Sequence, residues 1–319
     1  MTTVKRGKRN FKKGDAHLHE KPSVIYTFIQ AHSDEHAVEK MCEVLNVSKS
    51  GYYKWLKKQN QPQSEKEVYR SEIKQKISKS FHESFGTYGS PRVHADLVEW
   101  GYIISQKTVA RMMKEMGLKA TSKEKFVVTT DSNHDLYIYP NLLNRQFDVE
   151  EPNLVWVSDI TYIWTLEGWI YLSSVMDLYS RKIVGWSLAS HMRKELCIQA
   201  LKMAIISRQP GTGIVHHSDR GSQYCSKEYI DILKEQKMNI SMSKKGDPYD
   251  NACIESFHAT IKKDLIYRRR FRTRAEAIKA INSYISGFYN EKRKHSTLGH
   301  YSPNQFERYH HQDKVENIS

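Results

Sequence analysis

The first part of the chain has the periodicity of helices. Four apolar residues have the i, i+3, i+4, i+7 spacing of a single helix face: Val38, Met41, Cys42 and Leu45. Ser48 is placed to cap a second helix, which begins with the basic and aromatic residues 49–55. A helix, a short turn and a Ser-capped helix predict a helix-turn-helix-like region over residues 21–60. Any helical hairpin can produce the same pattern, so the pattern alone does not assign DNA binding.

A second helical module is predicted over residues 61–120. The pattern gives three helices: residues 66–82, a helix from Pro91 to Gly101 and a helix from Gln106 to Met116. Ser105 is placed to cap the third of them. Lys107 and Arg111 lie on the polar face of that helix. This face is either a solvated surface or a helix laid along DNA phosphates, and the pattern favours neither.

The sequence pattern changes from helical to β-rich after a linker predicted at residues 121–150. Three stretches are rich in β-branched and aromatic residues and predict a meander: residues 154–164, 168–179 and 182–188. Helices and short strands then alternate: helix 193–208, strand 214–217, helix 226–237, strand 239–243, helix 251–267 and a last helix over 273–290. This order predicts an α/β sheet with helices packed on it.

Composition adds a strong basic excess to this picture. The 319 residues include 50 Lys and Arg against 36 Asp and Glu, a formal net charge of +14. Residues 1–20 form a basic tail, which we expect to be disordered. The excess favours nucleic acid as the partner, with an acidic membrane surface second. No apolar run is long enough to span a bilayer, and no secretory signal is expected.

The cysteines point to a reducing compartment. Four of them lie far apart in the chain, without a C-x-x-C pair: Cys42, Cys197, Cys225 and Cys253. This spacing excludes a zinc ribbon, and a disulfide framework is not expected in so long a chain with so few cysteines. We therefore expect a cytoplasmic protein.

Three acidic residues stand out by their positions. Asp159 interrupts an apolar strand, Asp219 follows the end of another, and Glu255 lies in the first turn of a predicted helix. A carboxylate in an apolar strand is costly unless it is paired or binds a metal. Two acids at adjacent strand ends and one on a nearby helix could converge on divalent cations. Each acid alone has a simpler explanation, a lysine partner for Asp159 or the positive helix N-terminus for Glu255.

The spacing of these acids resembles a known pattern. There are 59 residues between Asp159 and Asp219 and 35 between Asp219 and Glu255, as in the DD(35)E pattern of retroviral integrases and of the insertion-sequence-3 family of transposases. The flanking residues resemble the same families: Trp156-Val-Ser-Asp159-Ile-Thr-Tyr, His217-Ser-Asp219-Arg-Gly-Ser-Gln-Tyr224 and Asp250-Asn-Ala-Cys-Ile-Glu255-Ser-Phe. Lys262 follows Glu255 by two helical turns, as it does in that family.

Further motifs extend the resemblance over residues 40–308. Near the end of the chain, Tyr289-Asn-Glu-Lys-Arg-Lys-His295-Ser-Thr-Leu-Gly299 is similar to the closing motif of the transposase family. Upstream, Val47-Ser-Lys-Ser-Gly-Tyr-Tyr-Lys-Trp and Tyr88-Gly-Ser-Pro-Arg-Val resemble its helical DNA-binding part. No leucine heptad is visible, so the chain resembles the downstream-frame product of an element whose upstream frame supplies the leucine zipper.

The resemblance implies a fold and a chemistry. Residues 151–270 would form an RNase H-like core with a mixed five-stranded sheet and flanking helices, and residues 271–319 a C-terminal helix and basic tail. Asp159, Asp219 and Glu255 would hold two Mg²⁺ ions, with Mn²⁺ as a substitute. The reaction would be cleavage of element ends followed by attack of the freed 3′-OH on target DNA.

The resemblance also implies partners. These are double-stranded DNA, a DNA-assembled homo-oligomer and the upstream-frame product, at the nucleoid and without a membrane. Lys262 would contact the phosphate beside the scissile bond; without the motif, a solvated helix lysine explains this residue equally well. The cluster of arginines that follows favours DNA contact, because like charges so close repel one another without a polyanion: Arg268, Arg269, Arg270, Arg272 and Arg274.

Two rival functions remain open from sequence. The first is a DNA-binding regulator that keeps the fold without catalysis. The second is an RNase H-type nuclease that cuts RNA–DNA hybrids. The helical modules and the arginines favour duplex DNA over hybrids.

Overall fold

The computed structural model describes residues 22–59, 62, 64–120, 136–244 and 248–316. These residues divide into two compact units, unit 1 (Met1–Ile73) and unit 2 (Lys74–Ser319), with the boundary inside a helix. The basic tail predicted for residues 1–20 and the first half of the predicted linker, residues 121–135, lie outside the described residues. Within the described ranges, no helix combines the length and the apolarity that crossing a bilayer requires.

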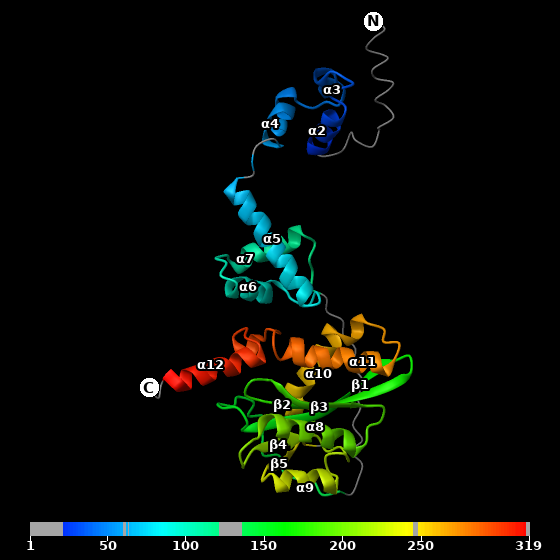
Figure 1. Ribbon diagram of the computed structural model, residues 1–319, viewed down its shortest axis with the longest axis vertical. Helices are drawn as coiled ribbons and strands as arrows, with labels where there is room; N and C mark the ends of the chain where they lie inside the picture. The colour runs from blue at the N-terminus through cyan, green and yellow to red at the C-terminus, as the bar shows by residue number, and fades with distance from the viewer. Residues whose placement is uncertain (1–21, 60–61, 63, 121–135, 245–247, 317–319) are drawn as a thin grey trace. The chain divides into compact units, whose positions relative to one another are not determined.

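In the described part of unit 1, three short helices surround a small core before α5 begins (Figure 1): α2 (Pro22–Ala31), α3 (Val38–Val44) and α4 (Lys49–Gln59). The Oγ of Ser48 accepts a hydrogen bond from the N–H of Gly51 at 3.2 Å, which confirms the predicted cap of α4. A Cβ on Gly51 would lie 2.3 Å from the Tyr26 hydroxyl, so glycine lets α4 pass close to α2. The predicted helix, short turn and capped helix therefore form as α3 and α4.

The second helical module follows in the order that the pattern predicts: α5 (Glu65–Glu83), α6 (Ser90–Glu99) and α7 (Gln106–Glu115). Ser105 caps α7, and its Oγ accepts the N–H of Thr108 at 3.3 Å. Gly101 and Gly117 follow α6 and α7 with φ of +84° and +68°, a conformation that glycine adopts without strain. The sequence thus marked both ends of α7.

A five-stranded mixed sheet forms the centre of unit 2, in the order β3-β2-β1-β4-β5. Its strands are β1 (Val155–Thr165), β2 (Gly168–Asp177), β3 (Ile183–Ala189), β4 (Val215–Ser218) and β5 (Asn239–Met242). The first three are antiparallel, as the meander predicted, whereas β4 and β5 run parallel to β1. β4 pairs with β1 only as far as Ser158, so the edge of β1 beyond Ser158 is not covered by β4.

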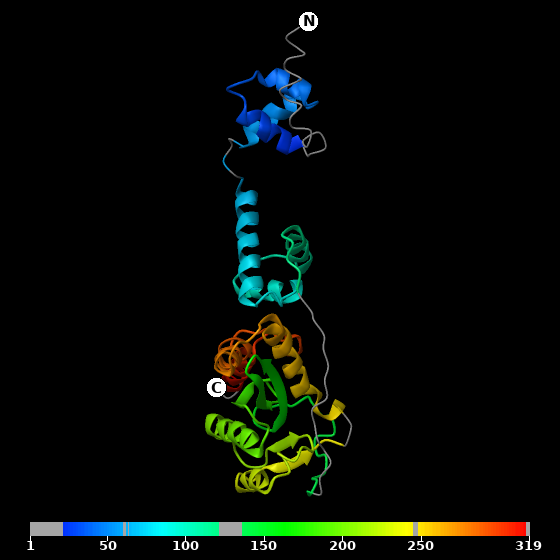
Figure 2. The ribbon, with the colours of Figure 1, turned by 90° about the vertical axis from the view of Figure 1, so that its right-hand side faces the viewer.

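Helices cover both faces of this sheet (Figure 2): α8 (Lys194–Arg208), α9 (Lys227–Glu235), α10 (Ala252–Asp264) and α11 (Arg274–Ser283). A Cβ on Gly185 of β3 would lie 2.2 Å from the Ala200 carbonyl oxygen of α8, so glycine allows α8 to pack directly on the strand. The neighbouring Trp186 donates from Nε1 to Asn282 of α11 at 2.8 Å. Successive side chains of a strand point to opposite faces, so α8 and α11 lie on opposite sides of the sheet.

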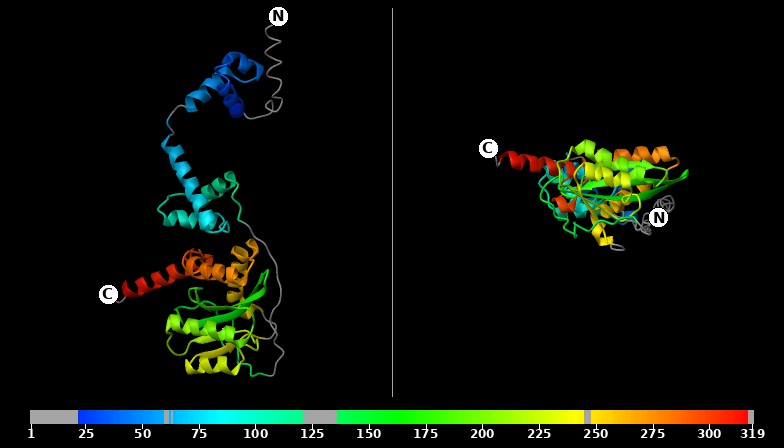
Figure 3. Two further views of the ribbon diagram at one scale, coloured as in Figure 1. Left: turned by 45° about the vertical axis from the view of Figure 1, so that its right-hand side comes forward. Right: turned by 90° about the horizontal axis from the view of Figure 1, so that it is seen from below.

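The C-terminal segment differs from the predicted elements. α11 ends at Ser283 and a π-helical turn, Tyr284–Tyr289, continues the last predicted helix. A further helix that the pattern did not indicate, α12 (Pro303–Glu316), extends away from the sheet (Figure 3). Short 3₁₀ turns complete the fold: Pro248–Asn251, Ile266–Arg268 and Ser296–Leu298.

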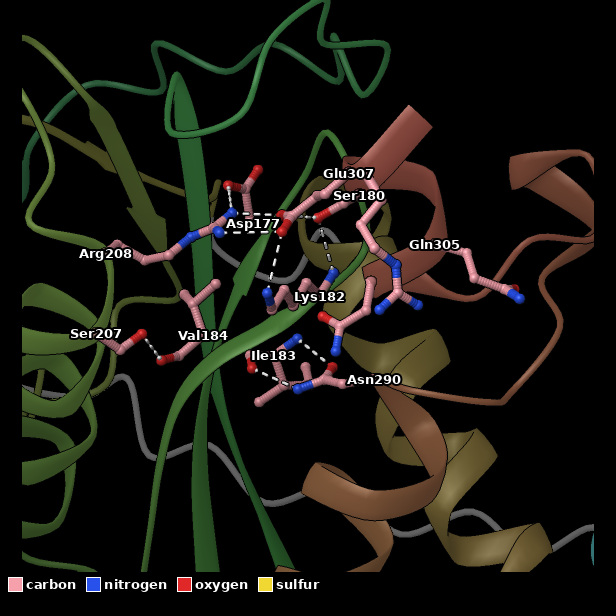
Figure 4. A network of polar contacts seen from close by, with 12 residues as sticks. Asp177, Ser180, Lys182, Ile183, Val184, Ser207, Arg208, Asn290, Gln305 and Glu307 are labelled. Atoms are coloured by element: carbon pink, nitrogen blue, oxygen red, sulfur yellow. Dashed lines mark hydrogen bonds and ion pairs between the residues drawn. The ribbon is translucent and has the colours of Figure 1, made fainter. Parts of the chain in front are cut away.

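A polar network ties α12 to the sheet (Figure 4). The carboxylate of Glu307 accepts hydrogen bonds from Ser180 Oγ at 2.7 Å, from Lys182 Nζ at 3.0 Å and from the guanidinium of Arg208. Arg208 also donates to Asp177 at 2.8 Å. Upstream of α12, the side-chain amide of Asn290 exchanges two hydrogen bonds with the backbone of Ile183. The C-terminal segment is therefore built into the compact unit that contains the sheet.

Candidate active site

Asp159 occupies the central strand of the sheet. In β1 it lies opposite Ser174 of β2, and its side chain points to the face covered by α10. Its Oδ1 accepts the N–H of Ile160 at 2.8 Å, and its Oδ2 lies 3.3 Å from Nδ1 of the buried His258 of α10. The carboxylate is only partly exposed, so it is held in place by local contacts rather than free in solvent.

Asp219 follows β4 and comes next to Asp159 in the sheet. Ser158 and Ser218 are direct partners in the parallel β1–β4 pair, so the two aspartates are the next residues on neighbouring strands. The Oδ1 of Asp219 accepts the N–H of Gly221 at 2.9 Å. A Cβ on Gly221 would lie 3.0 Å from that same oxygen, so glycine lets the loop close over the carboxylate.

Glu255 lies in the first turn of α10, as predicted. Partial burial raises the pKa of its carboxyl, and the carboxylates of Asp159 and Asp219 raise it further. His258, three residues after Glu255 on α10, lies 3.3 Å from Asp159, and Asp219 follows the residue that pairs with Ser158. The three predicted acids therefore come from elements that pack together: β1, the end of β4 and α10.

The donor chemistry of this site suits a hard divalent cation. Three carboxylates supply the oxygen ligands that Mg²⁺ and Mn²⁺ prefer. Among the described residues, no three His, Cys, Asp or Glu side chains are grouped closely enough to hold an ion as they stand. Asp159 and Asp219 each accept a local backbone N–H instead, and carboxylates of like charge repel one another unless a cation joins them.

Comparison with known proteins gives the family. Two models described as "Integrase core domain" match residues 149–248 and 236–303. The chain is 44% identical over 272 residues to the insertion element IS600 uncharacterized 31 kDa protein of Shigella sonnei, covering 85% of this chain and 99% of that protein. It is 39% identical to transposase InsF for insertion sequence IS3A of Escherichia coli (strain K12), covering 88% and 98%.

The chain belongs to the insertion-sequence-3 family of transposases. The transposase is thereby a polynucleotidyl transferase of the DDE class. A model described as "HTH-like domain" matches residues 69–126, which include most of α5, α6 and α7. A solved structure of the HTLV-2 integrase catalytic core domain in complex with magnesium is also similar, at 17% identity and a TM-score of 0.38 over 49% of this chain and 97% of that one.

Lys262 of the transposase lies beside the acidic site. Its ammonium is 4.5 Å from the centroid of the Tyr162 ring. Burial lowers the pKa of Lys262, and the Asp159 carboxylate opposes that effect, so the two residues are near each other. The structure therefore places the predicted phosphate contact on the Asp159 side of α10.

The other predicted DNA contacts lie on α7 and in the segment after α10. Lys107 and Arg111 are exposed on α7, opposite the buried Val109, Met112 and Met113. Arg268 is exposed but donates to the carbonyl oxygens of Lys263 and Phe85, which anchors it to the protein. Three arginines after it are exposed: Arg269, Arg270 and Arg272.

Sequence reasoning missed the role of Asp250, which supports the start of α10. Its buried carboxylate accepts hydrogen bonds from Asn141 Nδ2 at 2.9 Å, Arg145 Nε at 3.0 Å and Lys244 N–H at 2.9 Å. Burial acts to raise the pKa of Asp250, but the Lys244 N–H and the Arg145 guanidinium hold it below its usual value. The neighbouring Asn251 donates to the Ser158 carbonyl oxygen at 3.4 Å. These contacts fix α10 to the strand that carries Asp159.

The two histidines before Asp219 are structural and neutral. The Nε2 of His216 lies 3.0 Å from both the Ser158 and the Tyr229 hydroxyls, and burial lowers its pKa to about 3. The Nδ1 of His217 lies 2.8 Å from Ser241 Oγ, and burial lowers its pKa to about 4. Both rings hold β4 in register beside β1 and β5.

Proposed function

We propose that this transposase cuts DNA at element ends and joins the freed 3′-OH to target DNA, with Asp159, Asp219 and Glu255 as the metal ligands. The observation that carries the proposal is geometric: Asp159 and Asp219 follow the paired residues Ser158 and Ser218, and α10, which carries Glu255 in its first turn, contacts Asp159 through His258. Two Mg²⁺ ions, or Mn²⁺ in their place, would supply charge neutralisation at the phosphate and activation of the attacking oxygen when bound. The described residues supply the oxygen donors for them.

The chain's own residues position the DNA and balance its charge. In the first reaction a water oxygen bonds to the scissile phosphorus, and the 3′ oxygen leaves with a proton. In the second, that 3′ oxygen loses its proton, bonds to a target phosphorus and displaces the target strand's 3′ oxygen. Each reaction forms one P–O bond and breaks one, the first by hydrolysis and the second by transesterification, so catalysis is mainly positioning and charge stabilisation.

Basic residues would contact the DNA around this centre. Lys262, whose ammonium lies 4.5 Å from the centroid of the Tyr162 ring, would contact the phosphate next to the scissile bond. We assign duplex contacts to Lys107 and Arg111 of α7 and to the arginines that follow α10: Arg268, Arg269, Arg270 and Arg272. Since transposition acts on two element ends, we further propose a DNA-assembled homo-oligomer, acting with the upstream-frame product at the nucleoid.

Asp159→Asn tests the assignment of the site. We expect this variant to lose strand cleavage and transfer and to keep DNA binding, because one carboxylate ligand is lost while the basic surface remains. Gel assays with labelled element ends in Mg²⁺, with and without the upstream-frame product, measure both activities. Asp231→Asn on α9 is the matched control and should cut normally.

The same assay separates the rival functions. Cleavage by Asp159→Asn at the normal rate would remove Asp159 from the site. Binding without cleavage by the unmodified chain, with the upstream-frame product present, would indicate a regulator. Selective cutting of RNA in RNA–DNA hybrids would indicate an RNase H-type nuclease.

A further inference from the structure

We propose that Tyr162, Trp164 and Trp169 form an aromatic platform on which an unpaired base of a DNA strand stacks next to the Lys262 ammonium. The inference rests on the proposed function, because it gives the same active site a further contact with its DNA substrate. It differs from the assignments above in its chemistry: those residues contact phosphates, whereas the platform contacts a base.

The three rings form one continuous cluster on the β1–β2 hairpin. Trp164 and Trp169 are direct cross-strand partners, one pair away from the turn. Their ring centroids lie 4.9 Å apart at an interplanar angle of 71°, and the Trp169 and Tyr162 rings lie 5.1 Å apart at 78°. These edge-to-face contacts fix the rings against one another, so that the platform is preorganised.

The tryptophans are exposed where tryptophan is ordinarily buried. Trp164 is 54% exposed and Trp169 is 43% exposed, whereas Trp156 on the same strand is 0% exposed in the core. Leu166 in the turn between the two strands is also exposed. Neighbouring apolar side chains in water are unfavourable, and such patches mark binding sites. The fold therefore leaves the ring surface open rather than using it for packing.

The link between the platform and the acidic site is Lys262. Tyr162 is three residues after Asp159, so the two side chains leave β1 on opposite faces, on a part of the strand that β4 does not cover. The ammonium of Lys262 lies over the Tyr162 ring, and the charge of Asp159 acts on the same ammonium. A strand whose phosphate meets Lys262 would thus bring its next base within reach of the rings.

Positive charge identifies the occupant as a nucleic acid strand. The N–H of Leu166 donates to the Phe271 carbonyl oxygen at 3.0 Å, and the N–H of Arg274 donates to the Glu167 carboxylate at 2.8 Å. These bonds hold the arginine segment, residues 268–274, against the hairpin turn. Aromatic rings flanked by cations are the arrangement that binds single-stranded nucleic acid, with bases on the rings and phosphates on the cations. A second copy of this basic chain would meet like charge there.

Binding of two DNA substrates without divalent metal tests the platform. One is a blunt duplex and the other has a short unpaired 3′ overhang carrying 2-aminopurine, whose fluorescence falls when it stacks. For Trp164→Ala/Trp169→Ala we expect the affinity for the overhang substrate to fall about tenfold, because that is the loss of affinity typical of removing one base–aromatic stacking contact. The affinity for blunt duplex should fall less, and the quenching should disappear.

Two control variants keep the test decisive. Trp164→Phe/Trp169→Phe retains flat rings and should restore binding and quenching. Tyr301→Ala/Tyr309→Ala removes another exposed aromatic pair, with centroids 4.7 Å apart, and should leave both affinities unchanged. Thermal melting of each variant verifies that it is folded.

Three outcomes would overturn the platform. Unchanged overhang binding in the folded double-alanine variant, or an equal loss on both substrates, would show that the rings do not stack on an unpaired base. Loss of self-association with unchanged DNA binding would make the surface an interface between copies. Failure of the unmodified chain to bind either DNA would overturn the proposed function as well, whereas the first two outcomes leave that function standing.

Discussion

Asp250 is a buried carboxylate that supports the candidate site without being one of its three predicted metal ligands. Its three hydrogen-bond donors come from Asn141, Arg145 and Lys244, which are separated in the chain. They converge just before α10, where Asn251 also bonds to β1. Asp250 therefore holds the turn that leads into α10, the helix that carries Glu255.

Asp250→Asn should weaken catalysis more than DNA binding. The amide nitrogen of asparagine cannot accept hydrogen bonds from these donors, so at least one would lose its acceptor, at a cost of about 2 kcal/mol in stability. Loss of such support around metal ligands lowers activity by about tenfold or more. Denaturant unfolding and the strand-transfer rate measure the two effects. Asp231→Asn provides the comparison, and equal rates for both variants would contradict the role given to Asp250.

The acids of the site could be predicted from sequence, but their support could not. Asp159, Asp219 and Glu255 have a characteristic spacing and flanking residues, and the first two follow paired positions of β1 and β4. Asp250 stood inside the same motif, yet its partners lie up to 109 residues away. No pattern along the chain indicates which donors a fold will bring to a buried carboxylate.

At the scale of elements, α12 shows the limit of helical periodicity. α7 was predictable because Ser105 caps it, Gly117 ends it and its apolar face is regular. α12 is mostly polar, and its anchor is the ion-pair network of Glu307 with Arg208 and Lys182. Those partners belong to α8 and to the start of β3, so the signal for docking α12 is tertiary.

Glu307→Gln should destabilise unit 2. It leaves the nearly buried Arg208 with one carboxylate, Asp177, and removes the charge that Lys182 faces, so we expect a loss of about 3 kcal/mol. Glu291→Gln, which affects the exposed pair with Arg308, should cost no more than about 1 kcal/mol. Urea unfolding followed by tryptophan fluorescence measures both. A similar loss in the two variants would show that the network is no stronger than a surface pair.

At the scale of the whole molecule, charge governs association with DNA. The net charge of +14 predicts binding that depends strongly on salt, because each phosphate contact releases counterions. Among the residues to which we assign DNA contacts are the exposed arginines that follow α10: Arg269, Arg270 and Arg272. Their segment is hydrogen-bonded to the turn of the β1–β2 hairpin.

Neutralising those arginines should flatten the salt dependence. For Arg269→Gln/Arg270→Gln/Arg272→Gln we expect the slope of log affinity against log salt to fall by about one for each phosphate that the variant no longer neutralises. Titrations of duplex DNA at several salt concentrations measure the slope. Lys227→Gln/Lys234→Gln on α9 removes charge elsewhere and should leave the slope closer to that of the unmodified chain. An unchanged slope in the arginine variant would remove these residues from the DNA interface.

The sequence by itself indicated the family, the order of the elements up to α11 and three acids as candidate ligands. It could do so because helical periodicity, caps and motif spacing are properties of residues close together or at fixed intervals along the chain. Tertiary structure decided what surrounds them. It placed Asp159 and Asp219 side by side through the parallel β1–β4 pair, brought Asp250 its donors and docked α12 through buried ions. It also left Trp164 and Trp169 open to solvent. Burial and pairing depend on which distant residues meet, and only the folded chain specifies that.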